Sequence, residues 1–423
     1  MSLETVRVLV FPCGSEIGLE IIRSLRDVRG IELFGASSVE SNHGPYVLRR
    51  YRAGLPFVDA PEFLEKFNAL LREWRIDLVF PAHDDVVLRL AEARGGLEAE
   101  VAAPDAAVCA VCRSKRRTHE VFSGKLPMPQ LYEPGAVTAF PVFLKPDRGQ
   151  GSRGVWKCAD QAELAVFLRR DPSLLVMEHL PGPEHTVDCF TDAEGRLLHV
   201  LPRERVRVMN GIAVDTRPAP HRDPFGHMAR IIQDTLPMRG AWFFQVKEDG
   251  NGRPALLEIA PRVGGSMGLS RALGVNLPLL TVLDRMGGGA GEPRPLAVSA
   301  RMDRALECRF RTGLEFGAVL VDVETALLDG DRASPWVMAF LCQCKNNRLP
   351  VAAVAADPER ARGRMDALGL SSWLGDARRP GQVSAPSGSL LLTSDPELES
   401  FGRGHGFTVL PPNAVDVLLD WRV

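Results

Sequence analysis

The sequence has little excess of either charge and no long apolar run. Its 51 Lys and Arg are nearly balanced by 53 Asp and Glu, which leaves a net charge of −2. A protein whose main partner is nucleic acid normally carries a strongly basic face, so this balance disfavours that class. No apolar stretch approaches the roughly 20 residues that cross a bilayer. We therefore expect neither a nucleic-acid partner nor a membrane partner.

Paired cysteine motifs are also scarce. Of the eight cysteines, only Cys109 and Cys112 form a CxxC, and no second CxxC or HxxxH lies at zinc-finger distance. We interpret the cysteines as small buried hydrophobic residues, the commonest role of a free cysteine. The first segment, MSLETVRVLVFPCG, carries an early acidic residue and runs into a predicted strand, unlike a signal peptide. A cytoplasmic protein is the expectation.

The first hundred residues alternate strand and helix patterns. The chain of 423 residues, 45% of them hydrophobic, is long enough for two to four soluble domains. This alternation is typical of a parallel sheet with helices on its faces, and such sheets bind ligands at the carboxyl ends of their strands. The predicted strands are 6–11, 31–37 and 77–82, and the predicted helices are 17–28 and 61–74. The strand ends are Cys13-Gly14-Ser15, Ser37-Ser38 and His83-Asp84-Asp85.

Two common nucleotide-binding motifs are absent. The stretch FPCGSEIG has only Gly14 and Gly18 where a dinucleotide fold has G-x-G-x-x-G. No acidic residue follows the second predicted strand until Glu40, so a nicotinamide cofactor is disfavoured. The P-loop pattern G-x-x-x-x-G-K-[ST] is missing as well.

A different phosphate-binding pattern is present in VFLKPDRGQGSRGV. Lys145 ends a predicted strand, and Gly149, Gly151 and Gly154 follow within the next nine residues. A lysine at a strand end can reach phosphate oxygens, and the amides of a glycine loop can fold over them. The alternative is a glycine-rich hairpin that binds nothing.

Polar residues further along extend this interpretation. In MEHLPGPEHTVD the backbone from Glu178 to Leu180 is placed to meet the edge of a base, and Glu184 to accept hydrogen bonds from ribose. Gln245 and Glu258 lie on two predicted strands joined by the turn GNGR. Their oxygens could hold magnesium together with phosphate oxygens. Arg262 follows at once and could grip a phosphate.

At this point the sequence resembles the ATP-grasp superfamily, especially its carbamoyl phosphate synthetase-like and amino-acid ligase branches. Lys115 and the motifs FLKPDRGQGSRGV, MEHLPGPEHTVD, FFQV and LLEIAPRVGGS occur in the order and spacing of that family. Each motif alone is weakly specific, whereas five in order are specific. The resemblance covers residues 1 to about 290. It implies a parallel α/β pre-ATP-grasp domain (1–112) and an α+β ATP-grasp domain (113–292). The glycine- and proline-rich stretch GGGAGEPRPLA (287–297) favours a linker, which we expect at 293–312.

The resemblance also implies a reaction. It predicts an ATP-dependent ligase that joins a carboxylate to an amine through an acyl phosphate, releases ADP and phosphate, and acts on an amino acid or small peptide. The implied cofactors are ATP and Mg²⁺, with Mn²⁺ as a substitute, and a homodimer is possible. The implied residues are Lys115, Lys145, Gly149, Gly151, Ser152 and Gly154 for the phosphates; Glu178, His179 and Leu180 for adenine; Glu184 for ribose; Gln245 and Glu258 for metal; and Arg262 with Lys145 for catalysis.

One departure from the family pattern concerns the metal site. The family usually has E-x-N-P-R, whereas this chain has alanine at the third position, in Glu258-Ile259-Ala260-Pro261-Arg262. Alanine offers no oxygen ligand, although water often completes a magnesium shell. The alternative to a ligase is therefore a nucleotide-binding regulatory protein with impaired catalysis.

The substrate-binding candidates are three arginines in PRERVRV. Arg203, Arg205 and Arg207 alternate, so a regular strand would place all three on one face, where they could take a substrate carboxylate. The alternative is a solvated edge strand that carries charges against aggregation. Arg217, Arg271 and the turn VGGSMGLS are weaker candidates.

The last region, 313–423, resembles the Rossmann-like α/β domain of haloacid dehalogenase-like phosphatases. The stretch VLVDVETALLDGD matches the opening of that family, with Asp322 as candidate nucleophile, Glu324 as acid and Asp395 as magnesium ligand. Ala355 and Ala356 stand where the family has serine or threonine. The open alternatives are a bifunctional ligase/phosphatase and a degenerate structural or regulatory domain.

Overall fold

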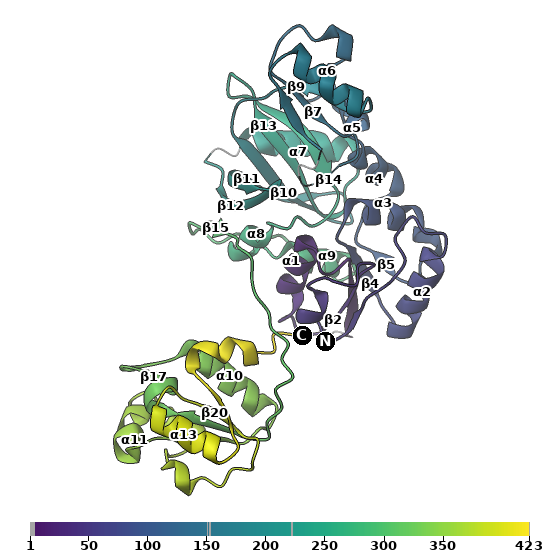
Figure 1. The fold of residues 1–423 in the computed structure, drawn as a ribbon. Helices are drawn as coiled ribbons and strands as arrows, with labels where there is room; N and C mark the ends of the chain where they lie inside the picture. Colours follow the sequence, from purple (N-terminus) through teal and green to yellow (C-terminus); the bar gives the residue numbers. More distant parts are fainter. Residues whose placement is uncertain (1–4, 150, 152–153, 221–222, 423) are drawn as a thin grey trace. The chain divides into compact units, whose positions relative to one another are not determined.

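The computed structural model describes residues 5–149, 151, 154–220 and 223–422 (Figure 1). These residues form two compact units, one ending at Leu306 and one spanning Glu307–Arg422. Both are built from helices and sheets, and the predicted α/β class is confirmed. Ser152, a predicted phosphate-binding residue, lies outside the described residues.

The first sheet is parallel, as the alternation of strand and helix patterns predicts. Its strand order is β3-β2-β1-β4-β5, and buried valine, leucine and phenylalanine fill β1 and β4 because helices cover both faces. The strands are β1 Val6–Phe11, β2 Ile31–Ala36, β3 Tyr51–Arg52, β4 Leu78–Pro81 and β5 Glu100–Val101. The helices of this part are α1 Glu16–Leu25, α2 Phe63–Trp74, α3 Asp84–Glu92, α4 Ala106–Arg113 and α5 Lys115–Phe122.

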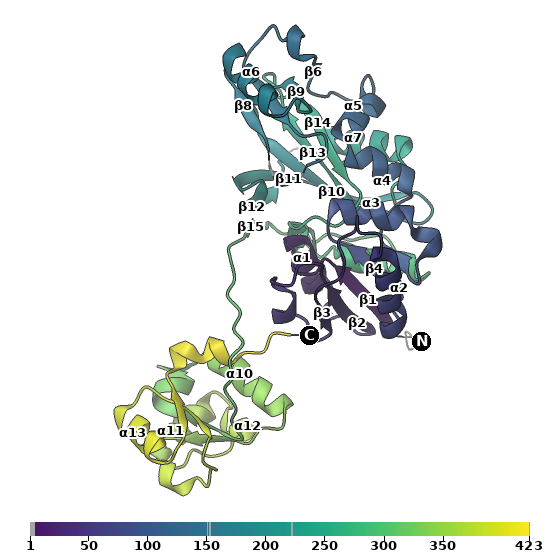
Figure 2. The same ribbon diagram turned by 45° about the vertical axis from the view of Figure 1, so that its right-hand side comes forward.

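Two further sheets carry the middle of the chain. The smaller has the order β6-β9-β7-β8 and the larger the order β14-β13-β10-β11-β12-β15. Both views show α6 beside the small sheet and α7 beside the large one (Figures 1 and 2). The small sheet contains β6 Leu131–Tyr132, β7 Val142–Lys145, β8 Trp156–Cys158, β9 Leu175–Glu178 and the adjoining α6 Gln161–Arg170. The large sheet contains β10 Glu184–Thr191, β11 Leu197–Met209, β12 Ile212–Pro218, β13 Gly240–Glu248, β14 Pro254–Ala260 and β15 Met302–Asp303, with α7 Asp223–Thr235.

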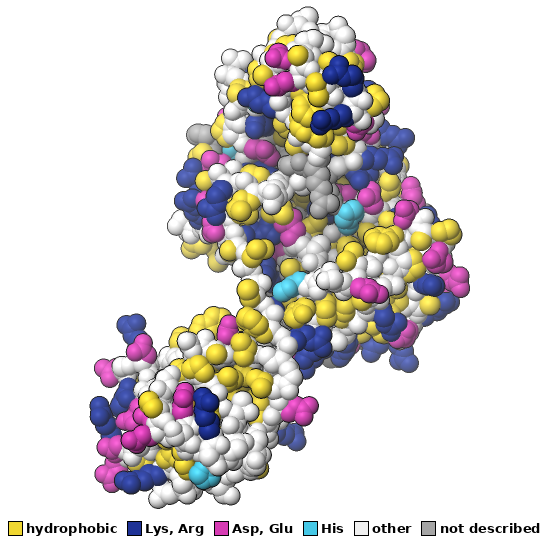
Figure 3. All heavy atoms as spheres, viewed as in Figure 1, with side chains coloured by type: hydrophobic (Ala, Val, Ile, Leu, Met, Phe, Trp, Pro, Cys, Tyr) yellow, Lys and Arg dark blue, Asp and Glu magenta, His cyan; other side chains and the backbone are white. Residues whose placement is uncertain are grey.

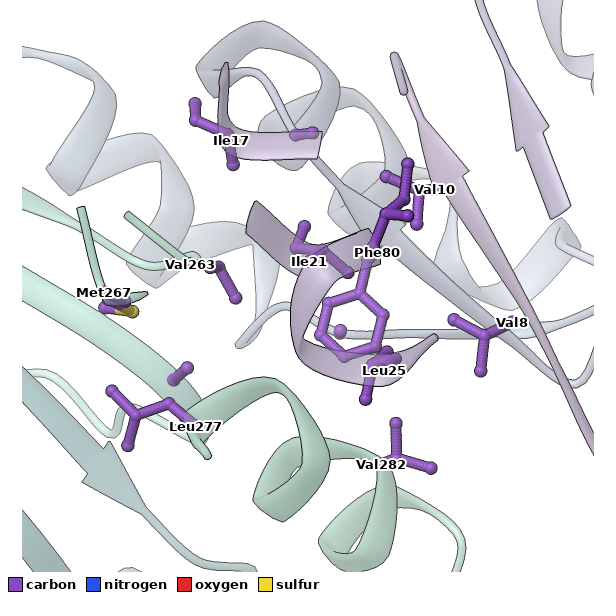
Figure 4. Close-up of a cluster of buried hydrophobic side chains, with 14 of the residues drawn as sticks. Val8, Val10, Ile17, Ile21, Leu25, Phe80, Val263, Met267, Leu277 and Val282 are labelled. Carbon is purple, nitrogen blue, oxygen red and sulfur yellow. The ribbon is translucent and has the colours of Figure 1, made fainter. Parts of the chain in front are cut away.

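One hydrophobic core joins the first sheet to the end of the middle region. Ile21 and Leu25 of α1 pack in the same buried cluster as Met267, Leu277 and Val282 (Figure 4). The residues from the middle region belong to or flank α8 Gly268–Ala272 and α9 Leu277–Arg285. Helix α1 is thereby held beside the large sheet, which contributes Phe243 and Ala260 to the same cluster.

The structure differs from the sequence prediction at two places. The pattern ALGVNLPLLTVLDRMG predicts one closing helix, but the chain breaks between α8 and α9. Gly274 adopts φ +87°, and the Asn276 side chain caps α9 by accepting from the Leu279 amide at 3.1 Å. In the expected linker, Met302 pairs with Thr216, so β15 extends the large sheet.

The second unit has its own parallel sheet and its own core. The strand order is β19-β16-β20-β21, and Val321, Phe340 and Leu392 are among the fully buried residues. The strands are β16 Val319–Asp322, β19 Val351–Val354, β20 Leu390–Leu392 and β21 Thr408–Leu410, with a hairpin of β17 Leu328–Asp329 and β18 Arg332–Ala333. The helices are α10 Pro335–Asn346, α11 Pro358–Ala367, α12 Ser371–Leu374 and α13 Pro396–Gly404.

The surface and the helices agree with the balanced composition. Acidic and basic side chains are interspersed on the face drawn in Figure 3. Within the residues that the structure describes, no helix combines the length and the apolarity needed to span a membrane.

Candidate functional site

A cavity of about 750 Å³ in the first unit is lined by residues from the small and large sheets and from the segments that follow β1 and β4 of the first sheet. The small sheet contributes Lys145, and the large sheet contributes Gln245 and Glu258. Glu16 and Asp84 come from the first residues of helices α1 and α3, which follow strands of the first sheet. Residues that are far apart in the sequence thus face one space.

The cavity lining carries an excess of positive charge. Among the described residues, its seven lysines and arginines outnumber its four aspartates and glutamates by three. The cations are Arg113, Lys115, Lys145, Arg203, Arg205, Arg262 and Arg304, and the anions are Glu16, Asp84, Glu184 and Glu258. Cationic lining of this kind favours an anionic ligand.

Lys145 stands at the end of β7, as the sequence predicts, with 8% of its surface exposed. Burial lowers the pKa of its ammonium to about 8; Glu258 opposes this shift, and Lys115 adds to it. Burial of an ammonium is costly, and phosphate oxygens would offset that cost.

Lys115 lies at the beginning of α5, beside the glycine loop. Its Nζ donates to the carbonyl oxygens of Gly149 at 3.1 Å and Asp147 at 3.4 Å. Asp147 in turn accepts from Ser114 Oγ at 2.9 Å, which ties the loop to the helix. The structure therefore brings Lys115, Lys145, Gly149 and Gly151 to one cavity.

The glycines of the loop adopt backbone conformations that other residues rarely adopt. Gly151 has φ +61° and Gly154 has φ +68°. At Gly154 a Cβ atom would also lie 3.1 Å from the Pro146 ring. These two glycines are required by the path of the chain itself. Gly151 lines the cavity.

The two predicted metal ligands lie directly opposite each other. Gln245 on β13 pairs with Glu258 on β14, next to a bulge, and both line the cavity. One carboxylate and one amide oxygen, with phosphate oxygens and water, form a set that suits Mg²⁺. The described residues include no group of three His, Cys, Asp or Glu that could hold a metal by themselves.

Ala260 lies two residues after Glu258 and is buried. It pairs with Phe243 and belongs to the hydrophobic cluster that joins the first sheet to α9. The position is therefore part of the core as well as of the cavity lining. An asparagine here would bring an amide to the edge of this apolar cluster.

Arg262 has a partner that the sequence interpretation did not assign. Its Nε and Nη2 donate to Asp84 Oδ1 and Oδ2 at 2.5 and 3.1 Å, and its guanidinium lies 5.3 Å from the centre of the Phe243 ring. Burial disfavours the charge on Asp84, but the Arg262 guanidinium outweighs it and lowers the pKa of that carboxyl. The sequence feature that could have identified Asp84 as a site residue is its position at the carboxyl end of a parallel strand, where such sheets bind ligands.

The expected adenine segment is placed differently from the phosphate residues. In the described part of the chain, the cavity lining does not include Glu178, His179 or Leu180. The Glu178 carboxylate accepts from the Gln130 amide at 3.1 Å. Base binding by this segment stays a prediction. Glu184 does line the cavity, and its Oε1 lies 2.9 Å from Arg205 Nε.

The three alternating arginines do not share one environment, which corrects the one-face prediction. Arg203 and Arg205 line the cavity, whereas the Arg207 side chain is 52% exposed and pairs with Asp303 at 2.6 Å. The reason is a change of register between β11 and β12 on both sides of Arg207. The weaker candidates Arg217 and Arg271 pair with Glu204 and Glu20.

In the second unit Asp322 ends β16, as the phosphatase-like pattern predicts, but its carboxylate is engaged within the protein. Its Oδ2 accepts from the hydroxyls of Thr325 at 2.5 Å and Thr393 at 2.8 Å, and its Oδ1 accepts from the Glu324 amide at 3.0 Å. Asp395 caps α13 by accepting from two backbone amides. The phosphatase-like roles of Asp322, Glu324 and Asp395 stay predictions.

Comparisons with known proteins bear on the first unit. Residues 170–307 match the family model for an ATP-grasp in the biosynthetic pathway with Ter operon. A search of curated protein sequences gave no match.

Three solved structures are similar to the chain in fold, all at low identity. N5-carboxyaminoimidazole synthetase from Staphylococcus aureus, complexed with ADP, has TM-score 0.59 and 13% identity, covering 72% of this chain and 83% of that chain. L-amino acid ligase from Bacillus licheniformis has TM-score 0.56 and 18% identity, covering 69% and 78%. Biotin carboxylase from Campylobacter jejuni, as a β,γ-ATP complex, has TM-score 0.55 and 15% identity, covering 66% and 71%.

The partial family match and these structures agree on the fold of this part of the chain. The cavity is lined by some of the residues that the sequence motifs single out, among them Lys145, Gln245 and Glu258. The unit that ends at Leu306 has the ATP-grasp fold.

Proposed function

We propose that the protein is an ATP-dependent carboxylate–amine ligase that acts on an amino acid or small peptide. The observation that carries this proposal is the cavity that collects Lys145, Gln245, Glu258 and Arg262 beside the glycine loop. Positioning and charge neutralisation are the main demands of phosphoryl transfer, and these residues meet both.

In the proposed first step, the substrate carboxylate attacks the γ-phosphorus of ATP. The bond from that phosphorus to the β,γ-bridging oxygen breaks, and ADP leaves with the bond electrons. Lys145 and Lys115 hold phosphate oxygens, and Arg262, fixed by Asp84, neutralises charge on the transferred group. Magnesium, held by Gln245 and Glu258, would supply further neutralisation of the phosphate charge.

In the proposed second step, the amine attacks the carbonyl carbon of the acyl phosphate. The C–N bond forms, the C–O bond to phosphate breaks, and the amine gives up a proton to water. Exclusion of water from the site helps at this step, because water would hydrolyse the acyl phosphate.

Two alternatives rest on particular residues. Ala260 in place of a polar residue favours a regulatory protein that binds nucleotide and turns it over slowly. A phosphatase activity of the second unit has less support, because Asp322 accepts three hydrogen bonds from its own unit. A homodimer also stays a prediction.

The test combines nucleotide binding with ADP release. Wild-type protein is titrated calorimetrically with MgADP and MgATP, and ADP release is then assayed with pairs of amino acids as acid and amine. Glu258→Gln should abolish release, because it removes the one carboxylate of the predicted metal pair. Glu65→Gln, which changes an exposed glutamate of α2, is the matched control.

The outcomes separate the hypotheses. Binding with pair-dependent ADP release that Glu258→Gln abolishes supports the ligase. Binding without release for any pair favours the regulatory alternative. If neither nucleotide binds, the cavity is not a nucleotide site and the proposal is wrong.

A further inference from the structure

Two buried polar side-chain atoms on neighbouring strands of the large sheet are without hydrogen-bonding partners among the described residues. They are Arg203 Nη1 and Thr186 Oγ1. Arg203 on β11 lies directly opposite Thr186 on β10, and both residues line the cavity. Buried polar groups in folded proteins are nearly always paired, so two unpaired ones side by side at a cavity indicate a ligand.

Arg203 is held rigidly by the groups around it. Its Nε and Nη2 donate to Asp188 Oδ2 and Oδ1, each at 3.0 Å, and Ser270 Oγ donates to Asp188 Oδ2 at 3.1 Å. All three side chains are 1% exposed or less. One edge of the guanidinium is thus bound to Asp188, while Nη1 is held in a fixed orientation with no partner among the described residues. A preorganised donor loses little freedom when it binds an anion.

Of the two donors, Arg203 is set apart from the predicted metal ligands, whereas Thr186 lies directly opposite Gln245. Across the sheet, Glu258 pairs with Gln245, Gln245 with Thr186, and Thr186 with Arg203. Adjacent strands are about 4.8 Å apart, so the backbones of Arg203 and Gln245 are separated by roughly 10 Å. Asp188, two residues beyond Thr186, draws the guanidinium further from the row that contains Gln245. An anionic group bound to Arg203 would therefore lie away from a phosphate bound beside Gln245 and Glu258.

The candidate subsite and the phosphate-binding candidates come from different elements. Arg203 and Thr186 lie on β11 and β10 of the large sheet. The phosphate-binding candidates Lys115 and Gly149 belong to α5 and to the loop after β7. The two candidate anion-binding regions thus come from different parts of the fold.

We propose that Arg203 Nη1 and Thr186 Oγ1 form a subsite for a carboxylate that does not react. This inference rests on the proposed ligase function and adds to it that one substrate carries a carboxylate besides the reacting group. Asp188 and Ser270 are positioning residues that fix Arg203. The carboxylate belongs to an amino acid: it is either the α-carboxylate of the one that serves as the amine or a second carboxylate of the one that serves as the acid.

The test measures binding before turnover. Each of the twenty amino acids, and the carboxamide of each, is titrated into wild-type protein saturated with MgADP. We expect at least one amino acid to bind, and its carboxamide to bind about tenfold more weakly or worse, as the loss of a charge-assisted hydrogen bond implies. If no amino acid binds, or if carboxamides bind as well as acids, the subsite is refuted.

Two variants and one control test whether the affinity for the amino acid depends on Arg203 and Thr186. Arg203→Lys keeps the charge beside Asp188 but removes Nη1, and Thr186→Val removes only the hydroxyl at nearly constant volume. Both should weaken binding of the amino acid, by about tenfold for Arg203→Lys and less for Thr186→Val, with unchanged MgADP affinity. Arg207→Lys, on the same strand but half exposed, should change neither. If Arg203→Lys fails to fold, Thr186→Val alone decides, and unchanged binding in it overturns the proposal.

Failure of the subsite and failure of the ligase can be told apart. Amino-acid binding that the variants weaken, without ADP release from any pair, would support the subsite and contradict the ligase. Isotope exchange between the bridging and non-bridging oxygens of ATP, with the acid alone, identifies the source of the carboxylate. If the variants impair this exchange, the non-reacting carboxylate belongs to the acid substrate. If exchange persists while product formation falls, that carboxylate belongs to the amine substrate.

Discussion

Lys145 shows how a binding residue can act against stability. It ends β7 in a buried position, and burial lowers its pKa from 10.5 to about 8. The unfolded chain therefore binds more protons than the folded chain between about pH 8 and 10.5. The unfavourable contribution of Lys145 to stability is fully present below pH 8 and is relieved as the pH rises through this window. The nucleotide phosphates would provide the missing counter-charge.

We predict that Lys145→Met stabilises the nucleotide-free protein while weakening its affinity for MgADP. At pH 7 the gain in unfolding free energy should be up to about 3 kcal/mol, the equivalent of the pKa shift. The loss of a phosphate contact should weaken MgADP binding by about tenfold or more. Thermal unfolding and calorimetric titration measure the two effects.

The control for this variant is Lys125→Met, which changes an exposed lysine and should alter neither quantity. Wild-type affinity for MgADP should also fall above pH 8, where free Lys145 loses its proton, and this fall should be absent from Lys145→Met. A variant that is less stable and binds MgADP unchanged would contradict this account.

At the scale of elements, the position of α1 decides which residues reach the cavity. Ser15 caps this helix by accepting from the Gly18 amide at 3.0 Å, and Glu16 follows in its first turn. Gly18 allows a close approach to the preceding strand, because a Cβ there would lie 2.5 Å from the Cys13 carbonyl oxygen. The glycine that looks like a remnant of a dinucleotide motif is thus a packing requirement.

Two glycine-to-alanine variants should have opposite effects on stability. Gly18→Ala should destabilise the first unit by about 1–3 kcal/mol or more, because its Cβ meets backbone atoms. Gly226→Ala, in α7 with open space around its Cβ, should stabilise it by about 0.5–1 kcal/mol. Denaturant unfolding checks both values. Equal effects of the two variants would show that the close approach at α1 does not limit stability.

At the scale of the whole molecule, each unit has a hydrophobic core of its own. The cluster around Ile21 and Leu277 belongs to the first unit, and the cluster around Phe340 and Leu392 to the second. The nucleotide candidates all lie in the first unit, and Asp322 lies in the second. We therefore expect each unit to unfold in its own transition, and a ligand of the cavity to stabilise only one of the two units.

We predict two transitions in calorimetric unfolding of the full chain. MgADP at a hundredfold its dissociation constant should stabilise one of them by about 2.7 kcal/mol. Asp322→Asn should lower the other by about 1–3 kcal/mol, because asparagine cannot accept all the hydrogen bonds that the carboxylate accepts. ADP release should be unchanged in this variant. If Asp322→Asn lowers the MgADP-sensitive transition or removes ADP release, the assignment by unit is wrong.

The sequence by itself determined the α/β class, the parallel first sheet and the strands that carry Lys145, Gln245 and Glu258. These features depend on local patterns, namely alternation of apolar residues, glycine turns and the order of motifs, which a chain carries wherever it folds. The pairing of Gln245 with Glu258 follows from a short hairpin, which is also local.

Only the tertiary structure decided which charged residues meet. The pairs Arg262–Asp84 and Arg203–Asp188 join residues from different elements, and no local periodicity encodes such contacts. A register shift sent Arg207 to the surface while Arg203 became buried, although both occupy alternate positions of one pattern. Long-range packing of α9 on α1 brings the first sheet to the cavity, because burial of apolar surface favours any contact that the chain geometry allows.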